Sequence, residues 1–139
     1  MIIPVLVLFY PVISKFPMEK QEIKQSLDFI QENIQSDDGV YVYYGASHAF
    51  AFYEQTSRIG VIADYPIMHG KWHGLENAPY DREISDLRGR VWLLFSHVIQ
   101  PADGESHERY MVDFLLRNGA ELLAEQKFAG SSVYYLDAK

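Results

Sequence analysis

The run "GASHA" at residues 45–49 places a serine between a predicted strand and a predicted helix. Its spacing is close to the G-x-S-x-G nucleophile elbow, with alanine in the last place. A serine hydrolase also needs a base and an acid, and His97 with Asp64 or Asp103 could fill these roles. The chain is short for such an enzyme and has no HGGG-like oxyanion loop. A helix-capping role is therefore favoured for Ser47, and hydrolysis stays as an alternative.

Two other patterns bear on metal and phosphate binding. His69 and His73 have the i, i+4 spacing of a metal pair in a helix, but Gly70 and Gly74 favour a loop there. Gly45 at a strand–helix turn would expose backbone N–H groups to an anion, yet the glycines of a G-x-G-x-x-G motif are missing. We therefore predict no metal and no cofactor.

Apolar spacing predicts alternating helices and strands after residue 16. Ile23, Leu27, Ile30 and Ile34 fall on one face of a helix that Pro17 opens. Strands are predicted at 40–44, 59–65 and 90–97, a loop at 66–77, and helices at 47–55, 79–88 and about 103–118. Residues 121–128 and 131–137 flank Ala129-Gly130 and predict a closing antiparallel hairpin, with a helical start of the first half as the alternative.

This order predicts an α/β fold, a small Rossmann-like three-layer sandwich with a mostly parallel sheet and a C-terminal antiparallel hairpin. Ligands bind such sheets beyond the carboxyl ends of the strands, where the strand order reverses. The loops that follow the predicted strands supply the candidate ligand-binding residues, with no catalytic residue among them. They are Gly45, Ser47, His48, Asp64, Trp72, Ser96 and His97.

Composition limits the class of partner. The chain has 139 residues, a net charge of −7 and no cysteine, which suits one α/β domain at 17–139 and disfavours nucleic acid. Residues 1–16 form a separate apolar segment, whose first 13 residues carry no charge. A bilayer span needs about 20 residues. Residues 1–13 are therefore either a buried strand or arm, with a possible homodimer contact, or the remnant of a membrane helix.

The segments "VYVYYGASHAFAFY", "GRVWLLFSH" and "SSVYYLD" resemble the C-terminal region of GT-C-type membrane glycosyltransferases, similar to the dolichyl-phosphate-mannose protein mannosyltransferases. The resemblance covers about residues 17–137, with Glu54 where the pattern has a second tyrosine. It implies a membrane-associated domain on the extracytoplasmic face, beside a membrane-embedded catalytic body. It also implies a lipid-phosphate-linked sugar donor and a glycan acceptor. The family's catalytic acids lie in the membrane part, so no catalytic residue is carried over.

Three functions follow from these observations. The first is a non-catalytic glycosyltransferase domain that contributes acceptor binding or packing. The second is a free-standing serine hydrolase that uses Ser47. The third is a small ligand-binding or dimerising module.

Overall fold

The computed structural model describes residues 23–102 and 104–139, which form a mixed α/β fold. The expectations for residues 1–16, for the helix start at Pro17 and for Asp103 lie outside these ranges. The helices are α3 (Lys24–Asn33), α4 (Ser47–Gln55), α5 (Tyr80–Ile84) and α6 (His107–Arg117), with 3-10 turns η1 (Tyr44–Ala46) and η2 (Gly60–Asp64). The strands are β1 (Gly39–Val42), β2 (Ile67–His69), β3 (Arg90–Ser96), β4 (Glu121–Phe128) and β5 (Ser131–Asp137).

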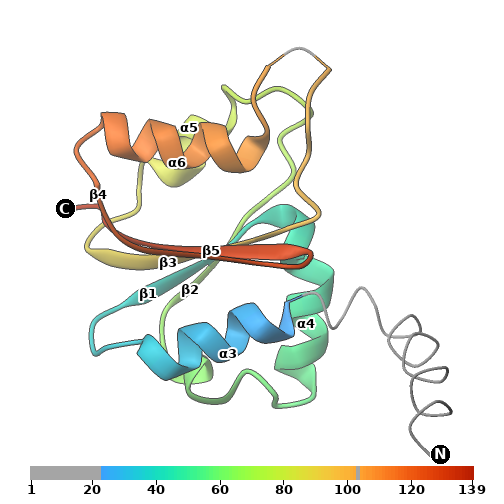
Figure 1. Ribbon diagram of the computed structural model, residues 1–139, viewed down its shortest axis with the longest axis vertical. Coiled ribbons are helices and arrows are strands. Elements are labelled where there is room, and N and C mark those ends of the chain that lie inside the picture. Colours follow the sequence, from blue (N-terminus) through green and yellow to red (C-terminus); the bar gives the residue numbers. More distant parts are fainter. Residues whose placement is uncertain (1–22, 103) are drawn as a thin grey trace, which may run out of the picture.

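The sheet is covered by helices on both faces (Figure 1). Helices α3 and α4 pack against one face, and α5 and α6 pack against the other. Strand β3 serves both layers, because Trp92 and Leu94 point to the first core while Leu93 and Phe95 point to the second. This explains why its sequence is almost wholly apolar. No helix in the described ranges has the length and apolar character needed to cross a bilayer.

The strand order is β2-β1-β3-β5-β4. Strand β1 runs parallel to β2 and β3, whereas β5 runs antiparallel to β3 and β4. The prediction of a mostly parallel sheet was therefore wrong, although the closing hairpin was predicted correctly. The physical reason is that β5 inserts beside the central strand β3, so the hairpin adds an antiparallel pairing within the sheet as well as at its edge.

The prediction of a strand at 59–65 was also wrong. Residues Gly60–Asp64 form the 3-10 turn η2, and the strand β2 begins at Ile67. Ile59 and Ile62 are buried three positions apart while Val61 is exposed, which is the spacing of a 3-10 turn and not of a strand. Gly60 has a φ of 57°, which also favours a turn at this position.

A buried carboxylate anchors the sheet at the amino-terminal end of β1. The Oδ2 atom of Asp38 accepts hydrogen bonds from the backbone N–H of Gln35 at 2.9 Å and from the indole of Trp92 at 3.0 Å. Its Oδ1 atom accepts from the hydroxyl of Tyr135 at 3.0 Å and pairs with Arg90 Nε at 3.0 Å. The rings of Trp92 and Tyr135 stack with centroids 4.1 Å apart. Asp38 thus joins β1, β3 and β5.

Candidate functional site

The chain leaves β1 and β3 toward opposite faces of the sheet. Helix α4 follows β1 on one face, and α6 follows β3 on the other. The carboxyl ends of these adjacent parallel strands therefore mark the switch point at which α/β folds bind ligands. The loop after β2, residues 70–79, approaches the same end of the sheet.

Two glycines hold these loops together by close backbone contact. A Cβ on Gly45 would lie 2.4 Å from the carbonyl oxygen of Ser96 and 2.6 Å from that of His97. A Cβ on Gly70 would lie 2.8 Å from the carbonyl oxygen of Val42, to which Gly70 donates its N–H at 2.7 Å. The loops after the three parallel strands therefore touch one another, with no room for a side chain between them.

Exposed aromatic rings lie on this end of the sheet. Tyr44 and Trp72 have ring centroids 5.5 Å apart, with the planes tilted by 43°. They are 41% and 46% exposed, although both are large and mostly apolar. Tyr44 begins η1, which follows β1, and Trp72 lies in the loop after β2, so the pair spans two of the three loops.

Glu83 of α5 clamps the loop on either side of Trp72. Its Oε1 atom accepts the backbone N–H of Lys71 at 2.8 Å and lies 3.0 Å from Nε2 of His73. Its Oε2 atom accepts a hydrogen bond from the hydroxyl of Tyr41. Burial, followed by this hydrogen bond, raises the pKa of the Tyr41 hydroxyl, which stays protonated and donates. Glu83 therefore fixes the position from which the indole extends.

A second buried network lies under the same loop. Nε2 of His107 lies 2.8 Å from the carbonyl oxygen of Leu75, which can only accept, so Nε2 carries the proton. Nδ1 then accepts from the Tyr43 hydroxyl at 2.7 Å, and that hydroxyl accepts the N–H of Ile99 at 3.3 Å. Burial raises the pKa of Tyr43 to about 12. With every polar atom paired, this network supports the loops from below.

Ser47 does not have the surroundings of a nucleophile. Its hydroxyl donates to the carbonyl oxygen of Tyr44 at 2.6 Å, and Ala46 occupies the cap position of α4. The capping role expected for Ser47 is therefore replaced by a hydrogen bond back into the preceding turn. In the described part of the chain, no hydrogen bond joins Ser47 to a histidine.

The other predicted site residues divide between the two ends of the sheet. Asp64 ends η2, before β2 begins, so it lies near the amino-terminal ends of the parallel strands and not near their carboxyl ends. His48 is exposed on α4. Ser96 is buried with an unpaired Oγ, and His97 is exposed with a φ of 50°. Ser96 and His97 border an open hollow of about 300 Å³ on the β5 side.

The two histidines at metal-pair spacing do not converge. His69 ends β2, and its ring packs edge-on against that of Phe50 with the centroids 5.7 Å apart. His73 instead lies within hydrogen-bond distance of Glu83. Among residues 23–102 and 104–139, no group of three or more His, Cys, Asp and Glu side chains is placed to hold a metal ion.

Sequence reasoning missed Glu83 and His107 as parts of this region, and it left Tyr44 out of the candidate ligand-binding residues. A usable signal was present, because the tyrosines at 41 and 43 lie in a buried strand and their hydroxyls need polar partners. The pattern did not identify these partners, since they come from helices 40 or more residues away.

Removing the Glu83 carboxylate should loosen the loop. We expect Glu83→Gln to lower the free energy of unfolding by about 1–3 kcal/mol, because the buried Tyr41 hydroxyl and the Lys71 N–H lose a charged acceptor. It should also raise acrylamide quenching of Trp72, which is the exposed one of two tryptophans. Glu76→Gln, in the same exposed loop, is the matched control. Unchanged quenching in Glu83→Gln would show that the clamp does not position the indole.

Searches against models of known protein families, curated proteins and solved structures found no match to this chain.

Proposed function

We propose that this chain is a non-catalytic, extracytoplasmic domain of a membrane glycosyltransferase and that it contacts glycan through Tyr44 and Trp72. The observation that carries the proposal is the exposed, tilted pair of rings at the switch point, 5.5 Å apart. Aromatic faces offer apolar area with a polar tip, and the C–H face of a sugar ring packs on such a surface while its hydroxyls stay in water. The partner is the membrane-embedded body, and the sugar is part of the lipid-phosphate-linked donor or the acceptor.

Four features support this assignment, and the first two favour it over a serine hydrolase. The Ser47 hydroxyl is engaged by a backbone carbonyl, and the Tyr43–His107 network is closed on itself. The mixed α/β fold agrees with the resemblance at a coarse level. The uncharged run at residues 1–13 has the composition of a membrane segment, which would tether the domain close to a lipid-linked sugar.

Binding can be tested through the intrinsic fluorescence of Trp72. Titration with soluble manno-, gluco- and galacto-oligosaccharides should shift the emission of the exposed indole, while Trp92 stays buried. We expect Trp72→Ala to weaken binding at least about tenfold, because one of two stacking faces is lost. Trp72→Phe should retain part of the affinity. Binding in these variants is followed by calorimetry.

Leu123→Ala, at an exposed apolar position on β4, is the control and should bind like the parent chain. The absence of binding across the panel would overturn the proposal, and so would binding that Trp72→Ala leaves unchanged. A separate test concerns the membrane body. A reading frame upstream of Met1 that encodes a run of apolar helices would support it.

A further inference from the structure

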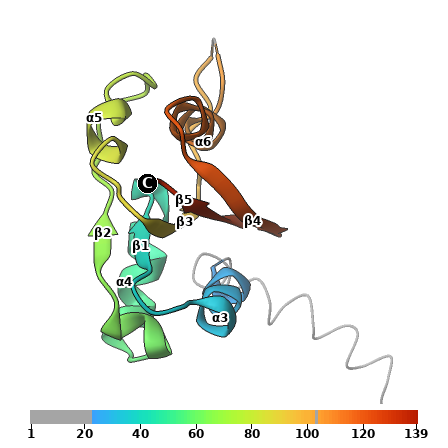
Figure 2. The same cartoon turned by 90° about the vertical axis from the view of Figure 1, so that its left-hand side faces the viewer.

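Strand β4 forms an edge of the sheet with one side unpaired in the described part of the chain. It hydrogen-bonds to β5 alone, and it is the last strand in the order β2-β1-β3-β5-β4. Figure 2 shows it projecting beyond the helices that cover the rest of the sheet. On its outer side, alternate N–H and C=O groups point away from β5, and such a row is a template for another strand.

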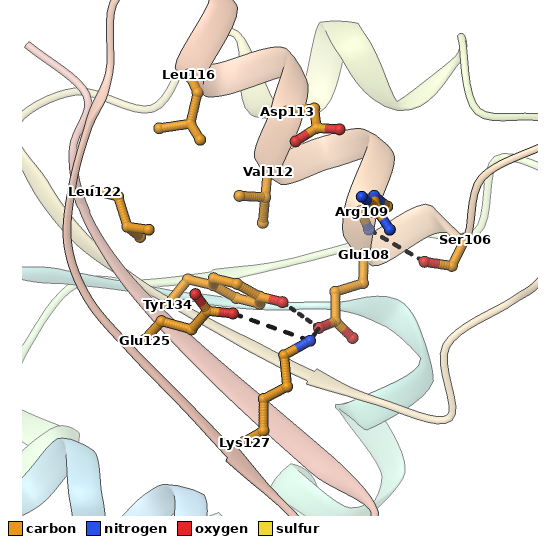
Figure 3. A pocket seen from close by; sticks show the side chains of 10 residues that line it. All are labelled: Ser106, Glu108, Arg109, Val112, Asp113, Leu116, Leu122, Glu125, Lys127 and Tyr134. Atoms are coloured by element: carbon orange, nitrogen blue, oxygen red, sulfur yellow. Dashed lines mark hydrogen bonds and ion pairs between the residues drawn. The ribbon is translucent and has the colours of Figure 1, made fainter.

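The two faces of β4 carry different side chains. Glu125 and Lys127 point toward α6, where they border an open groove of about 490 Å³ with an apolar floor that includes Val112, Leu116 and Leu122 (Figure 3). Ala124 and Phe128 point to the other face, where the ring centroids of Phe128 and Phe29 lie 6.2 Å apart. The Nζ atom of Lys127 is 3.7 Å from Glu108 and 4.0 Å from Glu125, and its side chain is 65% exposed.

We propose that β4 pairs with β4 of a second copy of this chain, antiparallel, across a two-fold axis that passes through Gln126. In this register, Glu125 lies directly opposite the partner's Lys127, and Lys127 lies opposite the partner's Glu125. Directly opposed residues of an antiparallel pair share a face, so both ion pairs form on the α6 side. The edge is therefore complementary in charge to itself, which is the requirement of a two-fold interface.

The neighbouring two-fold registers are disfavoured by the same charges. Centring the pair on Glu125 would place two glutamates face to face, and centring it on Lys127 would oppose two lysines. Like charges directly opposite each other destabilise a strand pair. Among these three registers, the one centred on Gln126 brings opposite charges together.

Side-chain size on the other face agrees with this register. Phe128 would lie opposite the partner's Ala124, so that a large ring covers a small side chain at both ends of the pairing. The ladder between β4 and β5 is irregular between Leu122 and Ala124, where Leu123 is the extra residue. A bulge twists the strand and ends regular pairing, so it limits the shared ladder to residues 124–128 of each copy.

Charge exchange gives a direct test. Light scattering of the full chain, in one buffer at increasing concentration, should show a dimer for the parent chain. Glu125→Lys alone and Lys127→Glu alone should each raise the dimer dissociation constant at least about tenfold, because both symmetry-related pairs become repulsive together. An equimolar mixture of the two variants should recover the parent affinity, since each pair again joins opposite charges. Glu121→Lys, beyond the bulge, should leave the dissociation constant within about twofold.

A parent chain that stays monomeric at all concentrations would overturn the proposal. A dimer that both single variants leave intact would overturn it as well, and would indicate a contact elsewhere, such as residues 1–13. Recovery in the mixture is the decisive result, because misfolded variants cannot rescue one another. Glycan binding is measured independently, so failure here leaves the proposed function standing.

Discussion

Replacing Asp38 by alanine is expected to lower the free energy of unfolding by about 3–5 kcal/mol, the largest stability change that we predict for a single side chain. The substitution leaves the buried indole N–H of Trp92, the hydroxyl of Tyr135 and the guanidinium of Arg90 without their shared acceptor. The cost comes from the buried donors of Trp92 and Tyr135, since each unsatisfied buried donor costs about 1–3 kcal/mol. Arg90 contributes less, because its side chain is 37% exposed and keeps its bond to the carbonyl oxygen of Ser36. Urea unfolding followed by circular dichroism measures the change.

Asp38→Asn separates charge from shape. The amide keeps one oxygen acceptor and nearly the same volume, so it should recover part of the lost stability but not the ion pair with Arg90. Asp37→Asn, at the exposed neighbouring position, is the matched control, because asparagine tolerates the φ of 71° found there. If Asp38→Ala unfolds at the same urea concentration as the parent chain, the carboxylate does not anchor the sheet.

Replacing Gly45 by alanine is expected to destabilise the protein by about 1–3 kcal/mol and to abolish the arrangement of rings at the switch point. The new methyl group would meet two backbone carbonyl oxygens at 2.4 and 2.6 Å, and neither oxygen can rotate away as a side chain would. The loop after β1 must therefore move, and it carries Tyr44 with it. Oligosaccharide titration and urea unfolding measure the two effects.

Gly74→Ala provides the comparison for this prediction. A Cβ at Gly74 has no atom within 4 Å, but its φ of 95° makes any substitution strained. It should therefore cost stability without pushing the loop after β1 away from β3. Equal losses of glycan binding in both variants would show that general destabilisation, and not the close approach at Gly45, governs the site.

The parts of the fold that depend on local pattern were predictable from the sequence. The helix α6 begins after Ser106, whose hydroxyl accepts the N–H of Arg109, and it ends before Gly119, which has a φ of 100°. The hairpin turns at Ala129-Gly130, as expected. Both features follow from residues within one or two turns of chain.

The parts that depend on distant pairing were not predictable in this way. Nothing in the local sequence of β5 distinguishes an edge position from a place beside β3, because that choice is made by long-range hydrogen bonds. Asp38 lies in a run that reads as an exposed turn, yet its partners come from β3 and β5. The loop that carries Trp72 is likewise held by Glu83, which lies beyond that loop in the sequence.

The position of β5 also affects how the chain can fold during synthesis. This strand is the last of the described strands to leave the ribosome, yet its place is between β3 and β4, in the interior of the sheet. Until residues 131–137 emerge, β3 has an open hydrogen-bonding edge and Trp92 lacks the ring on which it stacks. The nascent chain therefore carries an apolar strand with an unpaired edge from the synthesis of β3 until that of β5, a state in which chains are exposed to misassembly.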